Sequence, residues 1–192
     1  MVNQKNLDRA YMNCAVAMSE LSSARRKKVG AIVVQPNGGI IAEGYNGTPS
    51  GFDNFCEHIY ENHRFERMMD NNNNPLYYVC ARCKREYPLD YKHLIETNDK
   101  SLIACMITKS EVLHAESNAI SKVARSTNSS EGSTLYITLS PCFECAKLII
   151  QAGITRVVYG EDYRNPEGID LLDRAGIEVE HICDGSKNSP PF

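Results

Sequence analysis

Strand-like and helix-like stretches alternate along residues 111–182, and this alternation constrains the fold more than any other feature of the sequence. Short runs rich in β-branched and aliphatic residues, as in buried strands, occupy residues 134–140, 155–160 and 177–182. Helix-prone stretches open near Leu113 and span residues 141–152 and 169–175, and a glycine follows each of the last two. Strands that alternate with helices predict a layered α/β fold.

The N-terminal part of the chain adds a helix and a hairpin to this pattern. Apolar residues recur at helical spacing from Asn6 to Ala24, which predicts an amphipathic helix. Residues 29–35 and 40–46 then read as two strands joined by a tight turn. Because a hairpin pairs its strands antiparallel, the predicted sheet is mixed rather than wholly parallel.

The length of the chain, 192 residues, suits a single domain spanning 1–192, which can bury roughly 70% of its unfolded surface. Residues 52–110 differ from the rest, with four consecutive asparagines, many charges, few aliphatic residues and four of the eight cysteines. We interpret this segment as an insertion into the main α/β unit.

Charge and hydropathy exclude several classes of function. A net charge of -3 and a pI near 6.0 do not indicate the basic face that binds long nucleic acid, although a small anionic substrate needs only a few local cations. The N-terminal residues are not those of a signal peptide, and no apolar run reaches the ~18 residues of a membrane helix. We therefore expect a cytoplasmic protein with no membrane partner. In that compartment two C-x-x-C pairs favour metal binding over disulfides, although the cysteine count alone leaves both open.

His114 and Glu116 stand two residues apart at the start of a helix-prone run, where burial without partners would cost several kcal/mol. A second signal follows in Cys142 and Cys145, which share one face of a predicted helix N-terminus, with Ser140 as the expected N-cap. The helix dipole favours thiolates there, and thiolates bind zinc. A catalytic zinc takes three protein ligands and keeps one position open, so His114 is the best candidate for the third ligand.

Glu116 then has a separate role. Zinc in such a site lowers the pKa of water towards neutrality, and a neighbouring carboxylate can accept and return the proton. The pairing of H-x-E with P-C-x-x-C is the signature of zinc-dependent nucleobase deaminases.

With these motifs, the chain resembles the deoxycytidylate (dCMP) deaminase family of the cytidine deaminase-like superfamily, including its phage members. The resemblance covers roughly residues 7–56 and 111–182 and rests on HAESNA, SPCFECAKLIIQAGI, VGAIVV and GYNGTPSG. It implies a three-layer α/β/α sandwich with a five-stranded mixed sheet, and zinc-dependent conversion of dCMP to dUMP for thymidylate synthesis. It also implies a homohexamer that dCTP activates and dTTP, with Mg²⁺, inhibits.

The resemblance also assigns roles to single residues. Asn46 corresponds to an asparagine that contacts the sugar, and Asn46, Gly47 and Lys28 belong to the region that meets the allosteric nucleotide. The backbone of Ala115 is placed to hold the pyrimidine, and Tyr163 to close over the nucleotide. The phosphate requires cations, and the candidates, among which the sequence does not choose, are Arg25, Arg26, Lys27 and Lys28.

The cysteines of the insertion suggest a second, structural zinc. Cys80 and Cys83 form a knuckle-like C-x-x-C, and Cys56 and Cys105 flank it as further candidate ligands. His58 and His93 are rival ligands, and free thiols or a redox pair remain an alternative. Some phage members carry a second zinc near this loop with different ligands, so this parallel is loose.

Other functions remain open from the sequence. The substrate could be dCTP, or both dCMP and dCTP, and other zinc deaminases act on cytidine, tRNA adenosine or a riboflavin precursor. A non-catalytic zinc-binding regulatory subunit is an alternative from another class. Glu116 argues against it, because a structural zinc site does not require an acid that is not a ligand.

Overall fold

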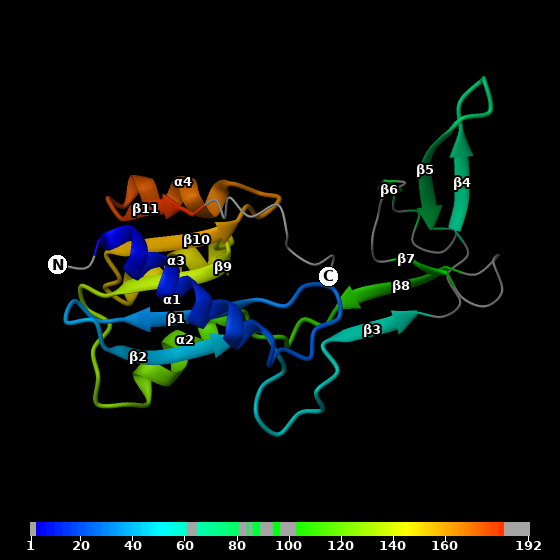
Figure 1. Ribbon diagram of the computed structural model, residues 1–192. Helices are drawn as coiled ribbons and strands as arrows, with labels where there is room; N and C mark the ends of the chain where they lie inside the picture. The colour runs from blue at the N-terminus through cyan, green and yellow to red at the C-terminus, as the bar shows by residue number, and fades with distance from the viewer. Residues whose placement is uncertain are drawn as a thin grey trace. The chain divides into compact units, whose positions relative to one another are not determined.

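The computed structural model describes residues 3–60, 65–80, 84, 86–88, 94–96 and 103–182 (Figure 1). The chain forms two compact units. The first comprises Met1–Asn54 and Glu111–Phe192, and the second comprises Phe55–Ser110. The organisation as one domain of 192 residues with an insertion at 52–110 remains a prediction.

The first unit is built on a five-stranded sheet in the order β11-β10-β9-β1-β2. Strands β9, β10 and β11 run parallel, whereas β1 is antiparallel to both β2 and β9. The sheet is therefore mixed, as the sequence predicted. The strands are β1 (Gly30–Val34), β2 (Ile40–Tyr45), β9 (Thr134–Leu139), β10 (Arg156–Glu161) and β11 (Glu178–His181).

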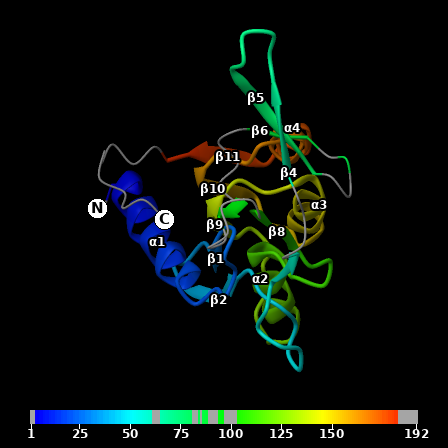
Figure 2. The ribbon, with the colours of Figure 1, turned by 90° about the vertical axis from the view of Figure 1, so that its right-hand side faces the viewer.

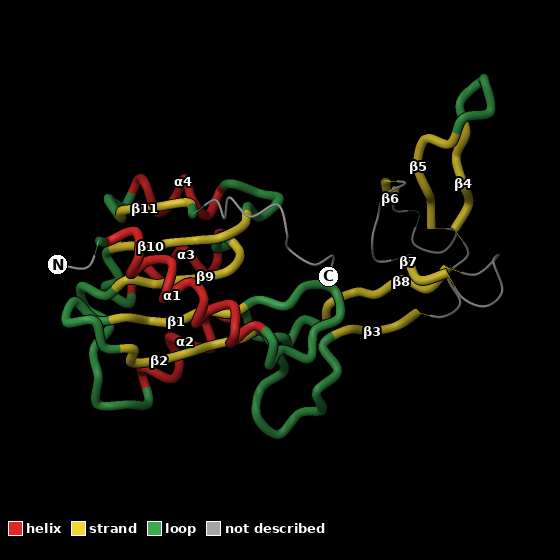
Figure 3. The backbone as a smooth tube through the Cα atoms, viewed as in Figure 1, coloured by secondary structure: helices red, strands yellow, loops and turns green. Residues whose placement is uncertain are grey.

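Helices cover both faces of this sheet (Figures 2 and 3). Side chains of β1 alternate between two clusters, with Ala31 and Val33 in one and Ile32 and Val34 in the other. Helix α1 packs on the second cluster, and the other three helices pack on the first. The helices are α1 (Gln4–Ser19), α2 (Ala115–Ala124), α3 (Phe143–Gln151) and α4 (Glu167–Arg174). These layers confirm the predicted α/β/α sandwich.

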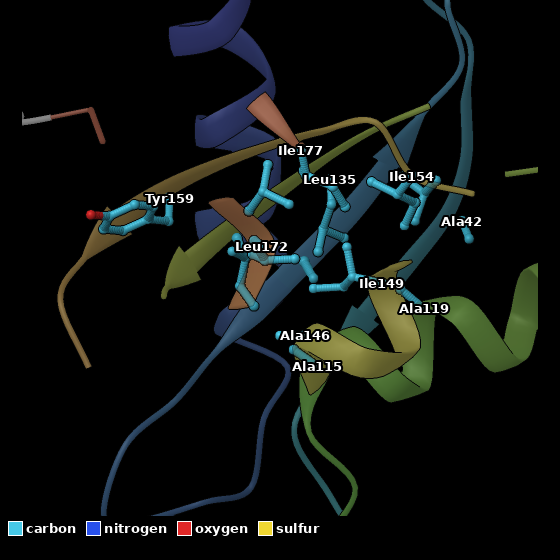
Figure 4. Packing of buried hydrophobic residues seen from close by; sticks show 14 of the residues in the cluster. Ala42, Ala115, Ala119, Leu135, Ala146, Ile149, Ile154, Tyr159, Leu172 and Ile177 are labelled. Carbon is cyan, nitrogen blue, oxygen red and sulfur yellow. The ribbon is translucent and has the colours of Figure 1, made fainter. Parts of the chain in front are cut away.

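The larger cluster fixes helices α2, α3 and α4 on the sheet (Figure 4). Leu135 of β9, Ile149 of α3 and Leu172 of α4 are all fully buried in it. Burying each such side chain stabilises the fold by about 1.5–3 kcal/mol. The N-termini of α2 and α3 are thereby held on the same face of the sheet.

Helix α1 is shorter at its C-terminus than the apolar periodicity predicted. It begins after the N-cap Asn3, whose side chain accepts a hydrogen bond from the Lys5 N–H, and it ends at Ser19. The chain then forms a loop in which the buried Ser22 donates a hydrogen bond to the carbonyl of Asn46. A tertiary contact therefore replaces the last predicted helical turn.

The described residues of the second unit form two three-stranded sheets, which the sparse aliphatic pattern did not predict. In each, neighbouring strands pair antiparallel. One sheet has the order β3-β8-β7, from Glu57–Tyr60, Ile103–Thr108 and Leu94–Glu96. The other has the order β4-β5-β6, from Phe65–Met69, Pro75–Cys80 and Glu86–Pro88. Among the residues described, no helix has the length and apolar character needed to cross a membrane.

Candidate metal centre and active site

Two helix N-termini carry the residues that the sequence singled out. His114 is the N-cap of α2 and Cys142 is the N-cap of α3, and both have extended backbone conformations. The expectation that Ser140 caps α3 was wrong. Its hydroxyl instead accepts a hydrogen bond of 2.7 Å from the backbone N–H of Tyr163, and the helix begins at Phe143.

Backbone hydrogen bonds position the segment that leads into α2. Gly47 and Leu113 exchange two hydrogen bonds, of 3.1 and 2.8 Å, directly before His114. Asn118 in α2 donates to the carbonyl of Tyr45 at the end of β2. The N-terminus of α2 is thus fastened to the end of β2.

The three predicted ligands lie together. The Nδ1 atom of His114 is 3.5 Å from the sulfur of Cys142 and 3.4 Å from the sulfur of Cys145. All three ligand atoms lie within 4.8 Å of one another. A tetrahedral zinc with ordinary Zn–N and Zn–S bond lengths separates a nitrogen and a sulfur ligand by about 3.6 Å. The cluster therefore has the chemistry and the spacing of a three-ligand zinc site, and it is the one such group within the described part of the chain.

The pKa values of the three candidate ligands are those of a site suited to binding a cation. Hydrogen bonds from Cys145 and His114 lower the pKa of the Cys142 thiol to about 3. The hydrogen bond to Cys142 raises the pKa of His114, with a further contribution from the charge of Glu116. Cys145 has a raised pKa because it donates to Cys142 and is buried. Metal binding therefore has to displace the protons held by His114 and Cys145.

Glu116 lies beside the cluster without belonging to the ligand group. Its side chain is buried next to Cys145, with 4% of the residue exposed. Burial raises the pKa of Glu116 to about 7. A carboxyl group of that pKa exchanges protons readily near neutrality.

The side chain of Asn46 braces the loop before β1. Its Oδ1 accepts from the N–H of Val29 at 2.8 Å, and its Nδ2 donates to the carbonyl of Lys27 at 2.8 Å. An amide has two donor hydrogens and two acceptor lone pairs, so one of each remains for a ligand. The bracing role was not predicted, because its backbone partners are 17 and 19 residues away in sequence.

The basic run is only partly available to a ligand. Lys27 forms an ion pair of 2.6 Å with Glu161 at the end of β10, and Lys28 donates to the carbonyl of Glu20 at 3.4 Å. Arg25 and Arg26 take part in interactions of their own. The local sequence pattern did not predict the contact with Glu161, since nothing in it connects this residue to a lysine 134 residues away.

The remaining predicted substrate residues lie in the same unit. Ala115 is fully buried and is the first residue of α2, where a backbone N–H has no partner within the helix. Tyr163 is half-buried in the loop that follows β10, and the guanidinium carbon of Arg164 lies 5.6 Å from its ring centroid.

The candidate second metal site is only partly described. Cys56 and Cys80 are fully buried in the second unit, and both take part in further interactions. Cys105 lies in β8, opposite Tyr60 of β3 and Leu94 of β7. His58 lies in β3, whereas Cys83 and His93 fall outside the described residues.

A three-layer α/β/α sandwich that presents H-x-E on one helix and C-x-x-C on the next defines a protein of the cytidine deaminase-like class. The sequence profile of the "Cytidine and deoxycytidylate deaminase zinc-binding region" matches residues 5–161. The chain belongs to this family of cytidine and deoxycytidylate deaminases, and it is a deaminase.

Named relatives support this assignment. The deoxycytidylate deaminase of Enterobacteria phage T4 is 37% identical over 176 residues, covering 89% of this chain and 87% of that protein. The enzyme of the same name from Saccharomyces cerevisiae is 30% identical over 176 residues, covering 91% of this chain and 44% of that protein. The dCMP deaminase of cyanophage S-TIM5, solved with dCMP and dUMP, has 37% identity and a TM-score of 0.66, covering 95% of this chain and 99% of that one.

Proposed function

We propose that the protein is a zinc-dependent hydrolase that converts dCMP to dUMP and so supplies thymidylate synthesis. The observation that carries this proposal is the placement of Glu116, which is buried against a complete His-Cys-Cys group without being one of its members. A purely structural zinc site does not require such an acid. The relatives support the choice of dCMP, since one of them is a dCMP deaminase in complex with dCMP and dUMP.

His114, Cys142 and Cys145 hold the zinc, which when bound supplies the Lewis acid that lets water ionise near neutral pH. Glu116 takes the proton released from that water, because its carboxyl group is the acid placed next to the cluster. It gives this proton to the pyrimidine ring nitrogen, then takes the second proton from the new hydroxyl at C4 and gives it to the amino group, which leaves as ammonia. The pyrimidine loses its exocyclic amino group at C4 and gains oxygen there, which balances the conversion of dCMP to dUMP.

The substrate is held by elements around the same helix N-termini. The backbone N–H of Ala115 contacts the pyrimidine, Asn46 contacts the sugar through its remaining amide donor and acceptor, and Tyr163 closes over the nucleotide. The phosphate is bound by the basic run, Arg25 to Lys28. Because Lys27 is already paired with Glu161, the phosphate has to compete with that carboxylate if it uses this lysine.

Regulation and assembly follow the family resemblance. The enzyme is a cytoplasmic homohexamer, activated by dCTP and inhibited by dTTP together with Mg²⁺. Asn46, Gly47 and Lys28 contact the effector, and the pairing of Gly47 with Leu113 gives that loop a direct connection to His114. A nucleotide that moves Gly47 would therefore act on the segment carrying the first metal ligand.

The second unit carries a structural zinc bound by Cys56, Cys80, Cys83 and Cys105. The support for this proposal is the full burial of Cys56 and Cys80 in a unit with few aliphatic residues. A closed site of four thiolates supplies folding free energy that a small apolar core does not.

One assay tests the substrate and the effectors together. Ammonia release is followed from dCMP, CMP, dCTP and deoxycytidine, each alone and with dCTP or with dTTP and Mg²⁺. The proposal expects dCMP to have the highest kcat/KM, with activation by dCTP and inhibition by dTTP. Faster deamination of dCTP than of dCMP would contradict it, and a lack of response to either effector would remove only the regulatory part.

A further inference from the structure

Helix α4 contacts the part of the metal centre that carries Cys142 and Cys145, called here the cysteine half, through a glycine. Gly168, in the first turn of α4, is buried against the backbone of Pro141 and Cys142. A Cβ added there would lie 2.9 Å from the carbonyl carbons of both residues and closer still to the carbonyl oxygen of Pro141. Real Cβ atoms essentially never come within 3.0 Å of such atoms, so any side chain would displace α4 or the Pro141–Cys142 backbone.

A second glycine makes an equally close contact with the segment from His114 to Glu116, called here the histidine half of the metal centre. Gly44, in β2, lies against the first turns of α2. A Cβ at Gly44 would lie 2.7 Å from the N atom of Ala119 and closer still to the carbonyl oxygen of Ala115, the residue between His114 and Glu116. Substitution would therefore push the N-terminus of α2 away from the sheet.

Neither glycine is required by its own backbone conformation, because neither has the positive φ that favours glycine. Glycine weakens both a helix and a strand interior relative to alanine. In a strand interior it marks a site where another backbone approaches closely. The two close backbone contacts thus explain why glycine is present despite the stability that it costs the helix and the strand. Each contact involves a residue that lies next to or within the metal centre.

We infer that Gly168 and Gly44 are positioning residues of the metal centre, which set the separation between the cysteine half and the histidine half through backbone contact. The ligand atoms come from two helices that do not follow one another directly, so their spacing of 3.4–3.5 Å depends on where each helix rests. Gly168 sets the position of Cys142, and Gly44 sets the position of the segment from His114 to Glu116. This inference rests on the proposed zinc site.

Gly30 provides a matched control. It lies in β1 and meets helix α1, where an added Cβ would lie 2.5 Å from the N atom of Ser19 and closer to the carbonyl oxygen of Ala15. The steric clash that Gly30→Ala creates is therefore similar to the clashes that Gly168→Ala and Gly44→Ala create. It falls on the opposite face of the sheet, where none of the three candidate ligands lies.

The experiment compares full-length wild type with Gly168→Ala, Gly44→Ala and Gly30→Ala. Zinc release to a chromophoric chelator is timed, and the phase that Cys142→Ser removes is assigned to this site. The visible absorption of the cobalt-substituted proteins reports the ligand geometry independently of activity. We expect all three variants to lose thermal stability, but only Gly168→Ala and Gly44→Ala to release zinc faster, by about 10- to 100-fold, and to show altered cobalt bands.

The possible outcomes distinguish failure of the inference from failure of the proposed zinc site. Wild-type release rates and cobalt bands in Gly168→Ala and Gly44→Ala would overturn the inference, as would an equal change in Gly30→Ala. If wild type shows no phase that depends on Cys142, the proposed zinc site itself fails. If Gly168→Ala does not fold, Leu172→Ala is used instead, because it loosens the packing of the same helix without creating a clash. Its control is Met12→Ala, which loosens the packing of α1. Faster zinc release in the first of this pair alone supports the inference, and equal release overturns it.

Discussion

The substitution Asp8→Asn tests the buried ion pair that fastens α1 to the sheet. Asp8 is 1% exposed and accepts hydrogen bonds from Arg156 at 2.7 and 3.0 Å, from the hydroxyl of Tyr136 at 2.6 Å and from Gln4 at 2.9 Å. Removing one partner of a buried pair costs about 3–5 kcal/mol. Asn keeps one acceptor, and Arg156 keeps its ion pairs with Glu178 and Glu180, so we expect the lower end, about 3 kcal/mol.

Urea unfolding followed by circular dichroism measures this loss. With an m-value of about 2 kcal/mol per molar urea, the midpoint of Asp8→Asn falls by about 1.5 M at pH 7. Asp173→Asn, an exposed carboxylate in α4, is the control and should leave the midpoint unchanged. An Asp8→Asn midpoint equal to that of wild type would refute the argument that this network stabilises the fold.

The pH dependence of the same difference has a defined sign. Burial alone would raise the pKa of Asp8, but hydrogen bonds from Arg156, Tyr136 and Gln4 outweigh it and lower the pKa below the usual 3.8. A carboxyl whose pKa is lowered by folding stabilises the protein above its unfolded pKa and loses that contribution as the pH falls through the folded pKa. The gap between wild type and Asp8→Asn should therefore shrink below about pH 4. Zinc release at low pH is common to both proteins and cancels in the difference.

Two further predictions concern the nucleotide phosphate and the second unit. Alanine at each position from Arg25 to Lys28 in turn should identify at least one residue whose loss raises the KM for dCMP by about tenfold while the KM for deoxycytidine stays constant, since about 1.4 kcal/mol of phosphate binding is removed. Equal effects on both substrates would assign the run to structure rather than to phosphate binding. Elemental analysis should find two zinc ions per chain in wild type and in the exposed-cysteine variant Cys14→Ser, but one in Cys80→Ser. One zinc in wild type would remove the structural site.

Local patterns predicted the layered α/β fold and its mixed sheet, whereas the three-layer sandwich was implied by the family resemblance. The hairpin of β1 and β2 and the alternation from α2 to β11 follow from apolar periodicity, which the two core clusters confirm. The His-Cys-Cys group was predictable for a similar reason, since each half of it lies within four residues at a helix N-terminus.

Features that depend on distant partners were not predictable from local pattern. Ser140 has the sequence context of an N-cap, but its hydroxyl binds the backbone of Tyr163 in another loop. Asn46 reads as a turn or sugar contact, yet both ends of its amide hold the backbone before β1. The strands of the second unit were missed because charged and polar residues interrupt the apolar alternation that marks a strand against a core.

The proposed mechanism requires Glu116 to move protons for deamination without holding the metal. Glu116→Gln tests it most directly, with Glu144→Gln as the control, because Glu144 occupies the matching second position of α3 but is exposed. Zinc content and ammonia release from dCMP are measured on the same samples. We expect wild-type zinc content in both variants, with kcat lowered by about 10²- to 10⁴-fold in Glu116→Gln alone. Glu116→Gln that deaminates dCMP at the wild-type rate, or that loses its zinc, would contradict this mechanism.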